Sequence, residues 1–386
     1  MTWWQRGPIG WVARLFGAQP GTGPAATQQA VPPWGRPTSP PQTNWLPPPQ
    51  QGTQRTWQQV APPGPIPVPS HPQPAPPPPR RWLPMPRRQR RAAPVPPAGP
   101  PDAGELRQRA LERNKLRIGI KIGEGGQGAV FTLQDDPSSV FKQYYTPIPH
   151  GTQSFSDLIG RRAGVEAVLG GAPVEMAWPE RLIVTGTDLD GYVMPKIGME
   201  YSVRIKGTPY PANFGYVFDR SGPFAHTPVP TQDQHRQLGL LVAVFLDALH
   251  RNDLTYGDMS WNNMLFRLTP TPGIFVLDVD GMRPMGRATF TGQRVAQTPD
   301  WFDPLSPDVE QEIGSFDLDR YKLALLIYRL LIARSFDAEL ARDLGGDLSV
   351  DGASPVQGRA IKRLLSRAMH AKGARPTAAE WVAVLS

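Results

Sequence analysis

The chain has 386 residues, a formal net charge of +8, 48 Pro and no Cys. Without Cys the protein has no disulfide, no thiol nucleophile and no Cys-ligated zinc, and its six His show no spacing typical of a metal site. The positive charge is concentrated at one end: residues 1–101 contain about ten Arg and no Asp or Glu. The rest of the chain is nearly neutral. The pI of about 9.8 therefore reflects this one segment, and it does not indicate that the whole protein binds nucleic acid.

Residues 1–104 have the composition of a disordered arm. They hold roughly 29 of the 48 Pro, in runs such as Pro76–Pro79 that favour extended polyproline II. Because Leu, Ile, Val and Phe are scarce here, the segment cannot bury enough apolar surface to offset the entropy of ordering. We expect a disordered arm that offers docking segments to a partner protein.

Two short segments of the arm differ from the rest. The basic cluster Arg80–Arg91 contains an embedded Trp, but its composition favours a solvated linker over contact with nucleic acid or an anionic surface. Near the N-terminus, Trp11, Val12, Leu15 and Phe16 have the i,i+4 spacing of a short amphipathic helix. Such a helix would suit a partner or a membrane surface.

Residues 105–386 are expected to form one α+β domain. Three β-like runs precede a helical stretch near 157–170, two more β-like runs follow it, and beyond residue 231 the pattern is mainly helical. The pattern predicts a small β-rich lobe at about 115–195 and a larger α-rich lobe at about 198–386. The predicted strands are Leu116–Ile120, Ala129–Leu133, Val140–Lys142, Arg181–Thr185, Tyr192–Met194 and Ile274–Leu277.

No apolar run is long enough to span a bilayer, since the two longest, at 238–249 and 323–333, are short and have helical periodicity. The N-terminus also lacks the uninterrupted apolar core of a secretory signal. We therefore expect a soluble, cytoplasmic protein.

A glycine-rich loop follows the first predicted strand. Gly123, Gly125, Gly126, Gly128 and Val130 fit the pattern G-x-G-x-x-G-x-V. Glycine lets the backbone pass close to phosphates and present N–H groups to them. A dinucleotide-binding loop opens into a helix, whereas this one opens into a strand. The order of elements therefore predicts a hairpin that covers nucleotide phosphates.

A lysine lies at the end of the second strand after this loop. The apolar neighbours of Lys142 would fix its stem while its ammonium reaches the α- and β-phosphates. Glu166, in the following helical stretch, is the expected ion-pair partner that holds Lys142 in place. Glu175 and Glu180 are nearby alternatives.

An Asp, an Asn five positions later and a second Asp after a short apolar strand complete the candidate site. Asp258 can orient or deprotonate a hydroxyl group, and Asn263 and Asp278 can hold magnesium against nucleotide phosphates. We choose Asp278 over Asp280 because Asp278 directly follows the strand that ends at Leu277. This set of residues predicts phosphoryl transfer.

Together these motifs resemble the Hanks-type protein kinases, and more narrowly an atypical bacterial serine/threonine branch. The resemblance covers about residues 117–384 and includes two further positions, Asp319 in a helix and Arg375 near the C-terminus. It implies a bilobal protein kinase-like fold, ATP with Mg²⁺ or Mn²⁺ as cofactors, and a protein substrate. Asp258 would be the catalytic base, assisted by Lys142.

The resemblance also implies how adenine binds. Tyr192–Ile197 is similar to the strand and hinge that hold this base in kinases. With Met194 as gatekeeper, the carbonyl of Pro195 would accept a hydrogen bond from the adenine amine and the N–H of Ile197 would donate one to the ring.

Four departures from the family pattern concern regulation and the substrate side. Tyr256–Gly257 replaces the usual His-Arg, so activation by phosphorylation has no evident arginine partner. Ser260 stands in place of a phosphate-contacting lysine, and Asp280 in place of a flexible glycine. Leu305 occupies the position of a glutamate, so Arg375 is expected to lack its usual ion-pair partner.

Three functions fit the sequence. The first is an active kinase that phosphorylates Ser or Thr hydroxyls, because Lys142, Asp258, Asn263 and Asp278 are all present. The second is a nucleotide-binding pseudokinase or scaffold, which the departures at Asp280 and elsewhere favour. The third is a small-molecule phosphotransferase of the aminoglycoside or choline kinase type, whose motifs are similar.

Overall fold

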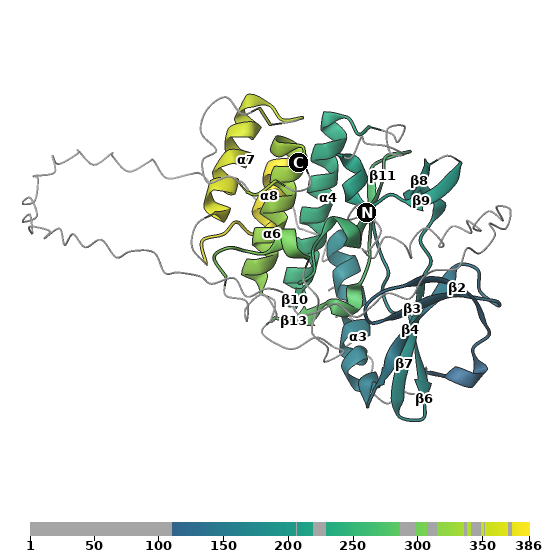
Figure 1. Cartoon of the computed structure of the whole chain (residues 1–386). Coiled ribbons are helices and arrows are strands. Elements are labelled where there is room, and N and C mark those ends of the chain that lie inside the picture. The colour runs from purple at the N-terminus through teal and green to yellow at the C-terminus, as the bar shows by residue number, and fades with distance from the viewer. Residues whose placement is uncertain are drawn as a thin grey trace, which may run out of the picture. The chain divides into compact units, whose positions relative to one another are not determined.

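The computed structural model describes residues 110–205, 207–218, 229–285, 298–306, 315–335, 338–340, 349–350, 352–369 and 373–386. The disordered arm expected over 1–104, its basic cluster and its N-terminal amphipathic helix lie outside these residues. The described part is mixed α+β, with a β-rich region followed by helices (Figure 1). The predicted α+β class is therefore confirmed at this level.

A six-stranded sheet dominates the first region. Its strands lie in the order β1-β6-β7-β4-β3-β2. The β1–β6 pair is parallel and the other neighbouring pairs are antiparallel. The bounds are Leu111–Glu112 (β1), Ile118–Glu124 (β2), Gly128–Leu133 (β3), Ser139–Ile148 (β4), Arg181–Thr185 (β6) and Asp188–Pro195 (β7).

Both faces of this sheet are covered, and alternation along β4 decides which side chain points where. Val140 and Tyr144 belong to the main hydrophobic core, while Phe141 belongs to a second cluster with Ile183 on the opposite face. Successive side chains of a strand point to opposite faces. Lys142 therefore points to the same side as Val140 and Tyr144, toward the main core.

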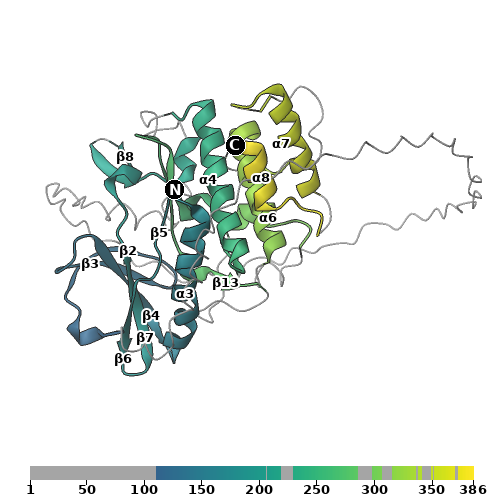
Figure 2. The same cartoon turned by 180° about the vertical axis from the view of Figure 1, so that it is seen from behind.

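In the described residues, five α-helices and a π-helical turn follow or interrupt the strands. Helix α4 begins with a capping box, in which the Thr231 hydroxyl accepts from the Gln234 N–H and the Gln234 side chain accepts from the Thr231 N–H. It packs against α6 and α8, as Figure 2 shows from behind. The bounds are Gly151–Leu169 (α3), Gln232–Arg251 (α4), Phe316–Tyr328 (α6) with the π-helical turn Arg329–Ala333, Pro355–Ala368 (α7) and Ala378–Leu385 (α8).

Three small sheets connect these elements. In the three-stranded one, β12 pairs antiparallel with β11 and parallel with β5, which follows α3. Two-stranded pairs join β8 to β9 and β10 to β13. The bounds are Val174–Met176 (β5), Ser202–Ile205 (β8), Thr208–Pro211 (β9), Leu254–Thr255 (β10), Met264–Arg267 (β11), Gly273–Val276 (β12) and Arg283–Pro284 (β13).

The predicted strands overlap β2, β3, β4, β6, β7 and β12, but β4 continues to Ile148, six residues beyond the predicted end at Lys142. Helix α3 begins at Gly151, earlier than the predicted 157. None of the helices in the described ranges is long and apolar enough to cross a membrane.

Candidate active site

The segment Tyr256–Asn263, which we call the Asp258 loop, lies between β10 and β11. Asp319 of α6 fixes its start: one carboxylate oxygen accepts from the Tyr256 N–H at 2.8 Å, and the other accepts from the Gly257 N–H at 2.9 Å. Gly257 has φ +77°, and a Cβ there would lie 3.1 Å from the Arg283 guanidinium. The bend before Asp258 therefore needs glycine.

Asp258 and Asn263 are brought together as predicted. The Asn263 Nδ2 donates to the Asp258 backbone carbonyl and to its Oδ2, both at 2.8 Å. The other carboxylate oxygen of Asp258 is buried and accepts no hydrogen bond in the described part of the chain. One oxygen is thus held in place by Asn263, and the second is enclosed without a hydrogen-bond partner of its own among the described residues.

The Asp258 carboxyl has a raised pKa, to about 6. Burial is the main cause and the nearby Asp278 charge adds to it, while Lys322 and the hydrogen bond from Asn263 act in the opposite direction. A carboxylate with a pKa near 6 is still ionised at neutral pH and is a stronger base than an ordinary Asp.

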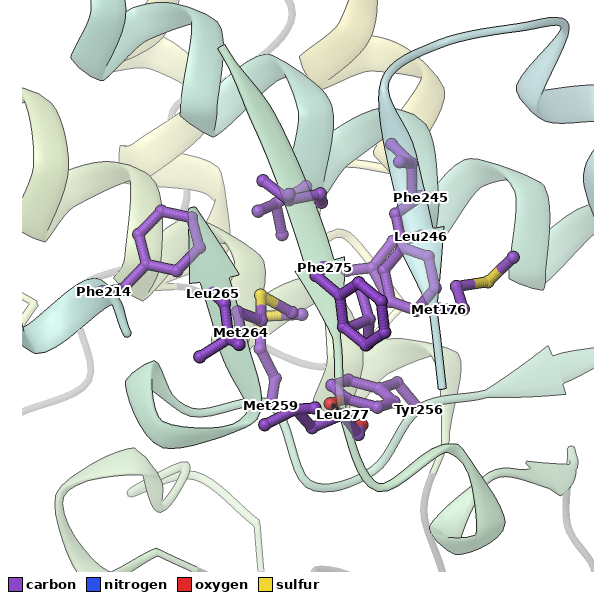
Figure 3. Packing of buried hydrophobic residues seen from close by; sticks show 14 of the residues in the cluster. Met176, Phe214, Phe245, Leu246, Tyr256, Met259, Met264, Leu265, Phe275 and Leu277 are labelled. Atoms are coloured by element: carbon purple, nitrogen blue, oxygen red, sulfur yellow. Dashed lines mark hydrogen bonds between the residues drawn. The ribbon is translucent and has the colours of Figure 1, made fainter. Parts of the chain in front are cut away.

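The pairing of β11 with β12 places Asn263 next to the strand that leads to Asp278. The Leu277 N–H donates to the Asn263 carbonyl at 2.9 Å, and the Tyr256 hydroxyl contacts the Asn263 and Leu277 carbonyls at 3.2 and 2.8 Å. Figure 3 shows Tyr256 and Met259 of the loop beside Leu277 in the buried cluster. These buried contacts and hydrogen bonds fix the positions of Asn263 and Asp278 relative to each other.

Asp278 is held in a strained conformation. Its φ of 49° and ψ of 41° lie in the left-handed region, which is uncommon for a residue other than glycine. The side chain is 44% exposed, unlike its neighbours in the site. Backbone strain of this kind is found at ligand-binding positions.

Asn263 and Asp278 fit a hard divalent cation. The Asn263 amide oxygen accepts no hydrogen bond within the described ranges, and Asp278 offers an exposed carboxylate. Mg²⁺ takes oxygen ligands and usually keeps water or phosphate among them. The described residues contain no group of three or more His, Cys, Asp or Glu that could hold a metal alone, so a cation here would also need ligands from phosphate or water.

Lys142 lies in a cluster of carboxylates. Its ammonium contacts the two oxygens of Asp280 at 2.8 and 2.9 Å and one of Asp278 at 3.2 Å. The Tyr144 hydroxyl donates to Asp280 at 2.9 Å. Burial alone would lower the pKa of Lys142, but Asp280 and Asp278 outweigh it and raise that pKa. The lysine is therefore charged.

The expected ion pair between Lys142 and Glu166 is wrong. The Glu166 side chain is half exposed and pairs with Arg162, one helical turn earlier, at 2.7 Å. Arg162 also contacts Glu180, one of the two alternatives, at 3.0 Å. Asp280 takes the place beside Lys142 because it is almost fully buried, and a buried carboxylate needs a cation.

The glycine-rich loop forms the turn of the β2–β3 hairpin, with the Gly125 N–H donating to the Gly128 carbonyl at 2.8 Å. Its glycines have different roles. A Cβ at Gly125 or Gly126 would meet no heavy atom within 4 Å, whereas one at Gly128 would lie 2.1 Å from the Gln143 carbonyl oxygen. The first two leave space over the loop and the third permits close strand pairing. Gly123 and Val130 are buried partners across the hairpin.

The predicted adenine-binding segment lies at the end of β7. Pro195 is the last residue of that strand and pairs with Ser139, and the next residue donates its N–H to the Ser138 carbonyl at 2.8 Å. Met194 and Ile197 are buried. The hydrogen bonds expected from Pro195 and Ile197 to adenine stay predictions.

Arg375 does have an ion-pair partner, contrary to expectation. Asp303, two residues before Leu305, contacts the guanidinium at 2.6 and 2.9 Å, and both side chains are fully buried. Asp317 lies 3.1 Å from the same guanidinium. The carboxylate missing at Leu305 is thus supplied from the same segment.

Sequence reasoning missed the roles of Asp280, Asp303 and Lys322. The last is a buried lysine of α6 that donates to the Gly257 carbonyl at 2.6 Å. Its spacing of three residues from Asp319 places both on one helix face, and this was the signal available in the sequence.

No protein-family model matches the chain, and no curated protein matches it.

Proposed function

We propose that the chain is an ATP-dependent protein kinase with a bilobal protein kinase-like fold, acting in the cytoplasm on Ser or Thr hydroxyls of a protein substrate. The observation that carries this proposal is the grouping of Lys142, Asp278 and the Asp258–Asn263 pair. These residues come from separate elements but are linked by direct contacts or by electrostatic influence on one another. Phosphoryl transfer depends on such positioning and on charge neutralisation.

Each residue has a role in this mechanism. The glycine-rich loop would cover the phosphates, with Gly125 and Gly126 leaving room for them. Lys142 would bind their negative charge. Asn263 and Asp278 would hold Mg²⁺ or Mn²⁺, which neutralises charge on the phosphates when bound. Asp258 would orient the acceptor hydroxyl and take its proton on the oxygen that has no other hydrogen bond.

The buried pair between Arg375 and Asp303 gives further support. The family resemblance expects a carboxylate to hold this arginine, and the chain provides one at a different position. A replacement of this kind favours the kinase-like arrangement of the helical part over an unrelated fold with a similar motif.

The test compares wild type with Asp258→Asn in an assay with γ-labelled ATP, Mg²⁺ or Mn²⁺, and a generic basic protein. We expect label on protein Ser or Thr with the wild type. In Asp258→Asn we expect transfer to fall at least about 100-fold while ATP still binds. Equal transfer by both proteins would contradict the assignment.

The second candidate is a nucleotide-binding pseudokinase, with the arm recruiting a partner. The contacts of Lys142 favour it, because two carboxylates already surround the ammonium that ATP would need. ATP binding without turnover in either metal would support this function. ATP consumption that depends on an amino alcohol or a sugar, and not on protein, would instead indicate a small-molecule phosphotransferase.

A further inference from the structure

The lysine that lies beneath the Asp258 loop comes from another element. Lys322 of α6 has no exposed surface, and its ammonium donates to the Gly257 carbonyl at 2.6 Å. This carbonyl belongs to the peptide bond that joins Gly257 to Asp258. A buried ammonium is costly unless it is paired, so its position next to this peptide is a specific feature of the structure.

Helix α6 holds three consecutive peptide units of the bend before Asp258. Asp319 accepts from the N–H groups of Tyr256 and Gly257, and Lys322 donates to the carbonyl of Gly257. The helix therefore satisfies both the donors and the acceptor of the bend that presents Asp258. A displacement of Lys322 would release the carbonyl end of this bend while leaving the N–H end anchored.

Four charged groups act electrostatically on the Lys322 ammonium: Asp258 in the loop, Asp319 on α6, Arg283 on β13 and Asp303 in the segment 298–306. Burial lowers the pKa of Lys322 to about 8, against the opposing effect of Asp258 and Asp319. In return, the lysine favours the ionised form of Asp258. The two residues are thus electrostatically coupled.

The Asp258 loop itself has no cation at position 260, where the kinase resemblance implies a phosphate-contacting lysine. Ser260 is neutral and 1% exposed, and its hydroxyl makes no hydrogen bond in the described part. Phosphoryl transfer needs positive charge arranged around the transferred group and its base. We infer that Lys322 is a positioning residue of the Asp258 loop and that its buried ammonium provides the positive charge that the loop lacks at Ser260.

This inference rests on the proposed kinase function, and two substitutions separate charge from hydrogen bonding. Lys322→Gln keeps a donor for the Gly257 carbonyl but removes the charge. Lys322→Arg keeps a charge that stays protonated at all accessible pH values. Lys115→Gln removes an exposed lysine far along the chain from the loop and serves as the matched control.

Phosphate transfer is measured from pH 5 to 10 for wild type and the three variants, with ATP as the varied substrate. For Lys322→Gln at pH 7 we expect a roughly 10- to 100-fold lower kcat with an ATP KM within about twofold of wild type. For wild type we expect activity to decline above about pH 8, as Lys322 loses its proton. Lys322→Arg should restore most of kcat and abolish this alkaline decline, and Lys115→Gln should match wild type.

A wild-type kcat in Lys322→Gln would overturn the inference, as would an unchanged alkaline decline in Lys322→Arg. A purely structural lysine would affect folding in both variants without changing the pH profile of the folded enzyme. If Lys322→Gln does not fold, the profile of Lys322→Arg still decides. A wild type without any transfer overturns the proposed function as well, whereas an active Lys322→Gln beside an inactive Asp258→Asn overturns this inference alone.

Discussion

Lys142 and Arg375 both lie in buried ion pairs, but the surroundings of the two pairs differ. The pair of Arg375 with Asp303 is fully enclosed, and each guanidinium nitrogen involved has its own carboxylate oxygen. The pair of Lys142 with Asp280 adjoins Asp278, whose side chain is 44% exposed. A closed pair has no open side at which a ligand could replace a protein partner, whereas a pair with an open side can make this exchange.

The largest effect is expected from breaking the closed pair. Asp303→Ala leaves the buried Arg375 guanidinium beside Asp317 and the Tyr321 ring, and removal of one partner of a buried pair costs about 3 to 5 kcal/mol. We expect about 3 kcal/mol, measured by urea denaturation, because Asp317 remains. Asp135→Asn, which breaks the exposed pair with Arg117, should have no measurable effect. Equal losses in both variants would show that enclosure does not matter.

The open pair should respond differently. Asp280→Asn leaves Asp278 beside Lys142, so we expect a smaller loss of stability than in Asp303→Ala. We also expect about tenfold weaker ATP binding, because Lys142 shifts when it loses the Asp280 charge. Isothermal titration with an ATP analogue measures the second effect. Glu166→Gln is the matched control and should bind within about twofold of wild type. A larger effect of Glu166→Gln would restore that residue as the partner of Lys142.

The pH dependence of stability separates two carboxylates near these pairs. Arg375 lowers the pKa of Asp303 despite its burial, so the stability it gives is present above the unfolded pKa and is lost as pH falls through the lower, folded pKa. The pKa of Asp258 is raised to about 6, so its protonated form is favoured by folding and that contribution is lost as pH rises through 6.

Asp258→Asn should therefore stabilise the protein at pH 7 to 8, by roughly 1 to 2 kcal/mol after allowance for partial exposure. The gain should vanish below about pH 4, where Asp258 is protonated in both states. Denaturation curves of wild type and Asp258→Asn at several pH values measure the gain in stability and the pH at which it disappears. A loss of stability at pH 8 would mean that the ionised carboxylate is favoured by the fold.

The smallest effect is expected at the tip of the glycine-rich loop. A Cβ at Gly125 meets no protein atom within 4 Å, so Gly125→Ala should leave the melting temperature unchanged and weaken ATP binding only about threefold. Gly128→Ala, whose Cβ would contact the Gln143 carbonyl, should lower the melting temperature instead. Reversed results would place the phosphate-facing side of the loop at Gly128.

The comparison shows which parts of the site a sequence can predict. Lys142 was predicted from its place in the strand that follows the glycine-rich hairpin, and Asp258 with Asn263 from a short motif closed by local hydrogen bonds. Their partners depend on contacts between distant segments. Asp280 is close to Lys142 only because the chain after β12 turns toward β4, and no local pattern distinguishes it from Glu166.

The dependence on contacts between distant segments also explains which strands the sequence could predict. Long strands such as β3 and β4 have enough residues to show alternation, and both were predicted. Strands β1 and β5 have two and three residues, too few for a period of two to be recognised. They form because β6 and β12 offer unpaired edges, which is a property of the assembled structure.

The pairing of β5 with β12 has a consequence for how the protein is made. Strand β5 follows α3 and precedes β6 and β7, but its partner β12 is synthesised much later. During synthesis Val174–Met176 emerges with an edge that nothing covers until the Asp258 loop has been translated. A fragment that ends at β7 would keep this edge exposed, so the β-rich region should be expressed together with the helical region when either is to be obtained folded.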